Sequence, residues 1–242
     1  MKTKKKLGII GGMGSVTAAY TFKRIIELTP AKTDQDYIEI FLHNNSCVPD
    51  RTQGILFNGS NPIPELTRSI HLLNETHADY IIFACITSHF YIPKLLAHTN
   101  AIIIDAIQET ARFIHEKHGG FKKIGIIAST GTLQSGIFHR ALEAYDFEGV
   151  ILKPGDQKTY FMEPVYSEWG IKAGHIHGEP TYRLKKAVRI LADMGAQAVI
   201  SGCTEVPLVI KPEDFELPIV DVIDIMAKVS INKCLERRVY DI

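Results

Sequence analysis

Short apolar runs alternate with longer amphipathic segments along the chain. Residues 9–10, 38–42 and 80–83 form such runs, and continuous apolar character is typical of strands that are buried on both faces. Residues 15–28 and 63–77 lie between the runs and carry apolar side chains at helical spacing. Strands that are separated by helices predict a parallel sheet with helices on both sides.

The second part of the chain continues this alternation. Residues 132–145 and 181–195 predict two more helices, and the second ends at Gly195, the residue that favours a helix C-terminus. A last helix is predicted at 223–238, directly after a short apolar run. We expect this helix to return and pack on the first part of the chain.

The chain also repeats itself. KLGIIGGMGS from Lys6 resembles KIGIIASTGT from Lys123, and ADYIIFACIT from Ala78 resembles AQAVISGCTE from Ala196. Three pairs of equivalent residues are each about 117 positions apart: Gly8 and Gly125, Cys85 and Cys203, and Asp105 and Asp221. A nearly constant spacing indicates two copies of one α/β unit.

The repeat predicts an α/β fold with two similar domains, each a parallel sheet flanked by helices. We expect pseudo-twofold symmetry between them, with the active site between the two domains. The predicted boundaries place residues 1–104 and 219–242 in the first domain, with the returning C-terminal helix, and residues 105–218 in the second.

Composition excludes several classes of function. Hydrophobic residues make up 45% and charged residues 22% of 242 residues, as in globular proteins with a real core. Lys and Arg together number 27, as do Asp and Glu, so net charge does not favour nucleic acid or an anionic membrane. We expect no membrane-spanning segment and no signal peptide. Four scattered cysteines without a C-x-x-C motif predict free thiols in a reducing cytoplasm.

Cys85 and Cys203 follow equivalent predicted strands. The carboxyl ends of parallel strands are where ligands bind in open α/β sheets. Each cysteine also precedes a predicted helix start, where free amide groups favour a thiolate and lower the thiol pKa. Thiols on opposite sides of a carbon acid can remove a proton from one face and return one to the other. The alternative is that both are small buried hydrophobic residues.

At this point the chain resembles a known family. The segments LGIIGGMGS, CVPDRT, ACITSH and SGCTE are similar, in this order, to the signatures of the aspartate/glutamate racemase superfamily, and of aspartate racemases in particular. The resemblance implies a cofactor-independent two-base mechanism with Cys85 and Cys203 as the catalytic pair, and a homodimer. It also implies an isomerase of amino-acid metabolism that needs no metal.

The resemblance further implies which residues hold the substrate. Thr87 and Thr204 correspond to residues that bind the α-carboxylate, and Arg51 and Lys172 to residues that favour a dicarboxylic amino acid. In addition, Asp50 and Glu205 are candidates to tune or orient a thiol, and Gly12 and Met13 form a turn whose amides face the substrate.

One position departs from the family pattern. Ile86 follows Cys85, where the family usually has asparagine. Isoleucine cannot make the amide's hydrogen bond, and an unmade polar contact costs about 1–3 kcal/mol. The exact acidic substrate is therefore open at this stage.

Two weaker patterns predict no separate site. The glycines from Gly8 to Gly14 do not have the spacing G-x-G-x-x-G, and no acidic residue ends the second predicted strand, so we expect a tight turn rather than a dinucleotide site. Cys85 and His89 have no second close pair of metal ligands. We expect His89 to pack or form a hydrogen bond near the helix start.

The sequence thus predicts a cytoplasmic amino-acid racemase acting on aspartate or a close acidic analogue. Two alternatives stay open. One is a related isomerase or decarboxylase that uses a single cysteine as nucleophile or acid, and the other is a non-catalytic protein that binds small acids.

Overall fold

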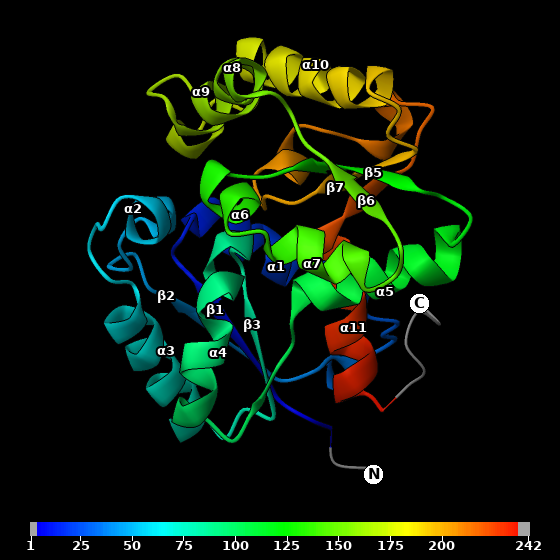
Figure 1. Ribbon diagram of the computed structural model, residues 1–242. Coiled ribbons are helices and arrows are strands. Elements are labelled where there is room, and N and C mark those ends of the chain that lie inside the picture. The colour runs from blue at the N-terminus through cyan, green and yellow to red at the C-terminus, as the bar shows by residue number, and fades with distance from the viewer. Residues whose placement is uncertain (1–3, 237–242) are drawn as a thin grey trace. The chain divides into compact units, whose positions relative to one another are not determined.

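The computed structural model describes residues 4–236 (Figure 1). Contacts between Cα atoms divide the chain into two units, and each is described by itself. Unit 1 comprises residues 1–109 and 223–242, and unit 2 comprises residues 110–222. The predicted last helix reaches residue 238, and its positions 237 and 238 lie outside the described residues.

Unit 1 contains a parallel sheet with the strand order β2-β1-β3-β4. The strands are β1 (Leu7–Gly11), β2 (Ile40–Asn44), β3 (Tyr80–Phe83) and β4 (Ile102–Ile103). Its longer helices are α1 (Ser15–Leu28), α2 (Arg51–Leu56), α3 (Ile63–Glu75) and α11 (Val222–Cys234), and α4 (Ile92–Leu95) is a single turn.

Two glycines of β1 show that helices cover both faces of this sheet. A Cβ at Gly8 would lie 2.7 Å from Leu73 of α3, and a Cβ at Gly11 would lie 2.4 Å from Ala18 of α1. Side chains three residues apart on a strand point to opposite faces. Helices α3 and α1 therefore pack on opposite sides of β1, where the missing side chains let them approach closely.

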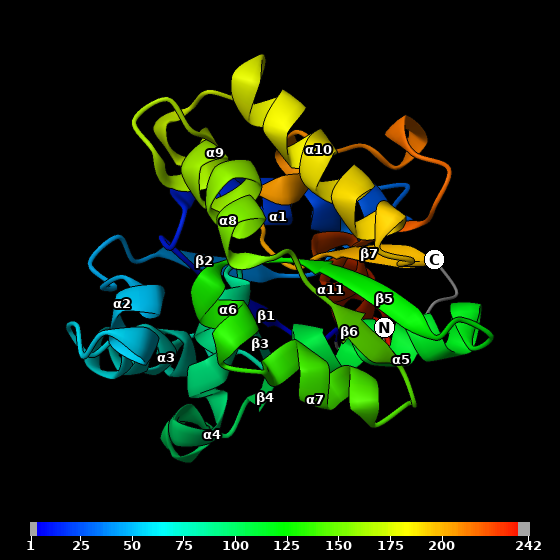
Figure 2. The ribbon, with the colours of Figure 1, turned by 45° about the horizontal axis from the view of Figure 1, so that its top comes forward.

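Unit 2 repeats this arrangement with the strand order β6-β5-β7-β8. The strands are β5 (Lys123–Ile127), β6 (Glu148–Val150), β7 (Ala198–Ser201) and β8 (Ile219–Asp221). Its helices include α6 (Thr130–Gln134), α7 (Ile137–Glu143), α8 (Pro154–Gln157), α9 (Glu163–Tyr166) and α10 (Glu179–Asp193), and α5 (Ala106–His118) carries the chain from unit 1 into unit 2. Figure 2 shows α10 and α7 on opposite sides of β5 and β6.

The predicted α/β fold with two parallel, helix-flanked sheets is confirmed. Both sheets have four strands, and the repeated segments occupy equivalent strands in the two sheet orders. The two units differ from the predicted domains at both boundaries. Residues 105–109 belong to unit 1 rather than to the second domain, and residues 219–222, which include β8, belong to unit 2 rather than to the first domain.

Local details differ from the prediction where glycine or strand pairing intervenes. The predicted helix at 132–145 is instead two helices, because Gly136 has a φ of 68° and interrupts the helical backbone. The second strand begins at Ile40 rather than Ile38, since Ile40 is the residue that pairs with Leu7 of β1.

Helix α11 joins unit 1 through its charged and backbone groups. Arg24 of α1 donates from Nε and Nη2 to the two carboxylate oxygens of Asp224, at 2.7 and 2.9 Å. The backbone N–H of Lys5 donates to the carbonyl oxygen of Cys234 at 3.1 Å. The helix is therefore tied to α1 at its start and to the N-terminal segment at its end.

Candidate active site

Cys85 lies at the carboxyl end of β3 in unit 1. β3 pairs with β1, and directly before Cys85 the Ala84 N–H donates to the Ile10 carbonyl oxygen at 2.9 Å. Cys85 itself has extended backbone angles and directly precedes a short 3₁₀ helix, Ile86–Tyr91. Its side chain is buried, and the residue is 5% exposed. The predicted helix start after Cys85 is therefore present as a 3₁₀ helix.

The residues after Cys85 are buried as well. Thr87 is 7% exposed, and Ile86 is 2% exposed. Ile86 thus places an aliphatic group inside the protein at the position where the resemblance implies an asparagine. Ser88 and His89 both bond the Cys85 carbonyl oxygen, Ser88 through Oγ at 2.6 Å and His89 through Nδ1 at 3.2 Å. The prediction that His89 forms a hydrogen bond near the helix start is confirmed.

Cys203 occupies the equivalent place in unit 2. It follows β7 after Gly202, where a Cβ would lie 2.9 Å from Phe138 and 3.1 Å from the Ile127 carbonyl oxygen. Only glycine allows the chain to pass this close to its neighbours. Cys203 is buried, at 7% exposure.

No α-helix begins at Cys203, and that part of the prediction is wrong. A turn follows the cysteine, and a 3₁₀ helix of three residues, Val206–Leu208, comes next. Pro207 within this stretch and Pro212 soon after it lack the N–H groups that a continuing α-helix needs.

Glu205 connects Cys203 to a lysine. The Cys203 thiol donates to Glu205 Oε2 at 2.9 Å, and Lys172 pairs with Glu205 Oε1. The Glu205 side chain is 4% exposed and that of Lys172 is 24% exposed. The Lys172 ammonium also lies 5.4 Å from the centre of the Tyr166 ring, within the range of a cation–π contact. Among the predicted site residues, the structure brings together Cys203, Glu205 and Lys172.

This environment raises the pKa of Cys203 well above its ordinary value. Burial is the main cause, because it penalises the thiolate, and the Glu205 carboxylate adds to it. Lys172 acts in the opposite direction. The lowered pKa that was predicted for Cys203 is therefore wrong. The physical reason is that Cys203 is buried beside a carboxylate and does not lie at the N-terminus of an α-helix.

Arg51 is buried at the start of α2 and binds the backbone. Its Nη2 donates to the Met13 carbonyl oxygen at 3.0 Å, and its Nη1 donates to the Pro49 carbonyl oxygen at 3.0 Å. These bonds link the turn after β1 to the loop before α2. Arg51 thus has a structural role, and its predicted grip on a substrate carboxylate stays a prediction.

Gly12 forms the tight turn that the sequence predicts. Its φ is 88°, and a Cβ there would lie 2.1 Å from the carbonyl carbon of Asn45. Glycine is therefore required both by conformation and by space. Met13, the next residue, is 3% exposed.

Asp50 and Thr204 lie in different surroundings. Asp50 is exposed and caps α2, since its Oδ1 accepts the Gln53 N–H at 2.7 Å. Its predicted action on a thiol stays a prediction. Thr204 is buried at 2% exposure, with Oγ1 at 3.4 Å from Glu205 Oε2. Tyr166 and Ser88 were not among the predicted residues. The serine three positions after Cys85 was the available signal, whereas nothing in the sequence pairs Tyr166 with Lys172.

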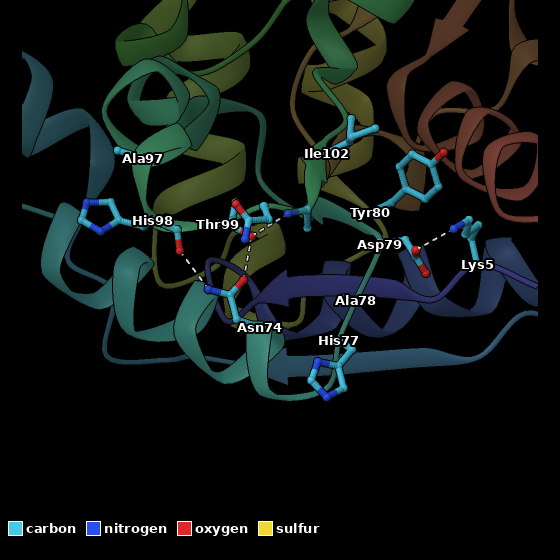
Figure 3. A pocket seen from close by; sticks show the side chains of 12 residues that line it. Lys5, Asn74, His77, Ala78, Asp79, Tyr80, Ala97, His98, Thr99 and Ile102 are labelled. Atoms are coloured by element: carbon cyan, nitrogen blue, oxygen red, sulfur yellow. Dashed lines mark hydrogen bonds and ion pairs between the residues drawn. The ribbon is translucent and has the colours of Figure 1, made fainter.

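A pocket of about 620 Å³ lies elsewhere in unit 1. It is at the amino ends of β3 and β4, where Tyr80 and Ile102 begin the strands (Figure 3). Its polar walls are bonded to one another, as in the bond from Asn74 to the His98 carbonyl oxygen at 2.8 Å. Cys85 follows the opposite end of β3, so this pocket is separate from the thiol.

The described residues 4–236 contain neither a metal-binding cluster nor a membrane-spanning helix. No group of three or more His, Cys, Asp or Glu side chains in this part of the chain could hold a metal ion. No helix within it has both the length and the apolar character that crossing a membrane requires.

Comparison with known proteins places these features in a family. Residues 10–229 match the model of the Asp/Glu/hydantoin racemase family. A broad specificity amino-acid racemase, RacX of Bacillus subtilis (strain 168), is 23% identical over 239 residues, which cover 95% of this chain and 98% of RacX.

Solved structures show the same fold. Picrophilus torridus aspartate racemase superposes with a TM-score of 0.83 at 23% identity, covering 97% of this chain and 96% of that one. Glutamate racemase from Francisella tularensis, solved in complex with D-glutamate, gives a TM-score of 0.69 at 16% identity, covering 98% and 82%. The superfamily predicted from the sequence segments is confirmed, and the chain belongs to the Asp/Glu/hydantoin racemase family.

Proposed function

We propose that this protein is an amino-acid racemase that needs no cofactor and inverts Cα with Cys85 and Cys203 as the two acid/base groups. The preferred substrate is aspartate or a close acidic analogue. The observation that carries this proposal is the equivalent placement of the two thiols. Each follows the strand that lies third in its sheet order, β3 in unit 1 and β7 in unit 2.

The surroundings of Cys203 support a defined starting state. Because burial and Glu205 keep its proton in place, Cys203 is the proton donor when the substrate enters. Cys85 then acts as the base in its thiolate form: the Cα–H bond breaks, an S–H bond forms on Cys85, and the electron pair stays on Cα. The Cys203 proton is transferred to the other face of Cα, and a thiolate is left on Cys203.

Lys172 contributes to this step through Glu205. When Cys203 becomes a thiolate, the nearby ammonium group partly compensates for the new negative charge. Lys172 is also the cation next to Cys203 with some exposure to solvent. We assign it, with Thr87 and Thr204, to the carboxylates of the substrate, and we keep Arg51 as a candidate for the side-chain carboxylate.

The difference between the two thiols supports one alternative. By the repeat, Glu205 of the second copy corresponds to Thr87 of the first, so Cys85 has no carboxylate at the matching position. Unequal thiols also suit a related isomerase or decarboxylase that uses only one cysteine as nucleophile or acid. A protein that only binds small acids would need neither thiol.

Exchange of the α-proton in heavy water distinguishes these functions. The wild type and the variants Cys85→Ser, Cys203→Ser and the double variant are incubated with L- and D-aspartate. Deuterium at Cα is followed by NMR and configuration by chiral chromatography. We expect exchange and racemisation in the wild type, and loss of racemisation by at least about a thousandfold in each single variant.

Several results would contradict the proposed function. Exchange that persists in the double variant excludes both thiols as the bases. Racemisation that needs only one cysteine favours the alternative chemistry. Cys47→Ser, which changes an exposed free cysteine, is the matched control and should keep wild-type activity. A panel of neutral and acidic amino acids then tests whether aspartate is preferred.

A further inference from the structure

His89 forms two hydrogen bonds inside unit 1. Its Nδ1 lies 3.2 Å from the Cys85 carbonyl oxygen, and its Nε2 lies 3.2 Å from the backbone nitrogen of Ala106. Cys85 is the residue that bears the thiol, and Ala106 is the first residue of α5. The imidazole therefore links the turn that bears Cys85 to the start of α5. His89 and Ala106 are 17 positions apart in the chain.

These two partners determine which nitrogen carries the proton. The Ala106 N–H can only donate, so Nε2 must accept and cannot carry a hydrogen. The carbonyl oxygen of Cys85 can only accept, so Nδ1 must donate. Both bonds exist together only in the neutral ring that is protonated at Nδ1. A doubly protonated ring would direct an N–H group of the imidazole at the N–H group of Ala106.

The surroundings of the ring also favour the neutral form. His89 is buried at 4% exposure, and the Phe83 ring packs edge-on against it with centroids 6.0 Å apart. Burial lowers the pKa of His89, and the Asp105 carboxylate opposes this effect. The Asp105 Oδ1 also accepts the Ile107 N–H at 2.9 Å and so caps α5.

We propose that neutral His89 is a positioning residue for Cys85, which it holds through the backbone carbonyl while it anchors the thiol-bearing turn to the start of α5. This role rests on the proposed function of Cys85 as a base. The Cys85 carbonyl oxygen accepts side-chain hydrogen bonds from Ser88 and from His89. Loss of the His89 bond allows the turn, and with it Sγ, to move. A misplacement of a reacting group by about 1 Å can cost about a hundredfold in rate.

Two substitutions separate the two hydrogen bonds. The amide nitrogen of asparagine can take the place of Nδ1, so His89→Asn keeps the donor to Cys85. The amide oxygen of glutamine reaches the place of Nε2, so His89→Gln keeps the acceptor for Ala106 and loses the donor. We expect kcat to fall about 10- to 100-fold in His89→Gln with KM within about twofold, and to stay within about threefold in His89→Asn. His71→Asn, on the exposed side of α3, is the matched control.

Two further measurements do not depend on racemase activity. Long-range ¹H–¹⁵N correlation spectra of the wild type, with His89 assigned by its loss in the variants, should show a neutral ring protonated at Nδ1 at pH 7. The rate of alkylation of Cys85, read by mass spectrometry of its peptide, should change at least about threefold in His89→Gln and remain near wild type in His89→Asn and His71→Asn.

The results that overturn the role of His89 are distinct from those that overturn the racemase. A ring protonated at Nε2, or equal effects of His89→Asn and His89→Gln on the Cys85 alkylation rate, would disprove the positioning role. Absence of racemisation and of α-proton exchange in the wild type would disprove the proposed function. The spectra and the alkylation rates would still test the positioning role of His89. If His89→Gln does not fold, His89→Asn still assigns the His89 resonance, and the tautomer seen in the wild type provides the test.

Discussion

The Cys203 thiol donates its proton to Glu205 Oε2 at 2.9 Å, and the other oxygen of the same carboxylate pairs with Lys172. Cysteine and lysine thus act on one another through a single buried carboxylate. Its negative charge keeps the thiol protonated, whereas the ammonium group favours the thiolate. Glu205 and Lys172 therefore shift the pKa of Cys203 in opposite directions.

Replacing the two charged residues should shift Cys203 in opposite directions. Glu205→Gln removes the carboxylate that raises the Cys203 pKa, so this pKa should fall. Lys172→Met removes the cation that lowers it, so the pKa should rise. The rate of Cys203 alkylation as a function of pH, measured on its own peptide, checks both. Shifts in the same direction would contradict this account, and Glu213→Gln, an exposed change, should leave the profile unaltered.

Lys172→Met should also destabilise the protein. It leaves the Glu205 carboxylate buried without its cation, and removing one partner of a buried ion pair costs about 3–5 kcal/mol. We expect the lower end of this range, because Lys172 keeps some exposure. Urea unfolding gives the free energy. Lys185→Met is the control: it breaks a more exposed pair with Asp214, at 2.7 Å, and should cost at most about 1 kcal/mol. Similar losses in both variants would show that the burial of Glu205 has no effect.

Gly12→Ala should be strongly destabilising. The new methyl group would meet the Asn45 backbone at 2.1 Å, and the φ of 88° is unfavourable for alanine. Backbone strain of this kind costs about 1–3 kcal/mol before the clash is added. Gly155→Ala is the matched change, with no atom within 4 Å of the new Cβ, and should be neutral or slightly stabilising. Thermal unfolding of the two variants decides, and an unaffected Gly12→Ala would contradict the geometry of this turn.

Asp224→Asn should weaken the attachment of α11 to α1. The change removes the charge from a two-bond pair with Arg24, at 2.7 and 2.9 Å, and such bidentate pairs are stronger than single surface bonds. We expect a coupling energy of about 1 kcal/mol in a double-mutant cycle of Asp224→Asn and Arg24→Met. A coupling near zero would mean that this ion pair does not contribute to holding the helix.

Buried His89 should make stability depend on pH. Its pKa is lowered in the folded state by burial, so its contribution is fully present above about pH 6.5 and is lost as the pH falls toward the folded value. The unfolded chain then binds a proton that the folded chain does not, which gives a slope of up to about 1.4 kcal/mol per pH unit. Urea unfolding between pH 7 and 5 should show this slope. His89→Asn should reduce it, and His71→Asn should not.

The sequence alone predicted much of the fold because its signals are local. The runs at 80–83 and the helix at 15–28 agree with β3 and α1, since buried strands and amphipathic helices each impose a period on neighbouring residues. The helix predicted at 132–145 is interrupted at Gly136, because a glycine can continue a helix or interrupt it, and the choice depends on tertiary contacts.

For the candidate site too, some features follow from the sequence and others only from the fold. The repeat and the family segments selected Cys85 and Cys203 as candidates, and the family resemblance added Glu205 as a candidate to tune or orient a thiol. The pairing of Glu205 with Lys172, the bridge from His89 to Ala106 and the binding of Arg51 to backbone carbonyls could not be read from the chain.

What the order of residues determined on its own is therefore the repeated strand-and-helix pattern and the family, and it selected the two thiols as candidates. Tertiary structure alone decided which charged groups surround Cys203 and which hydrogen-bond partners His89 has. The reason is physical: periodicity and chain direction act between neighbours in sequence, whereas burial and electrostatic interactions depend on groups that only folding brings together.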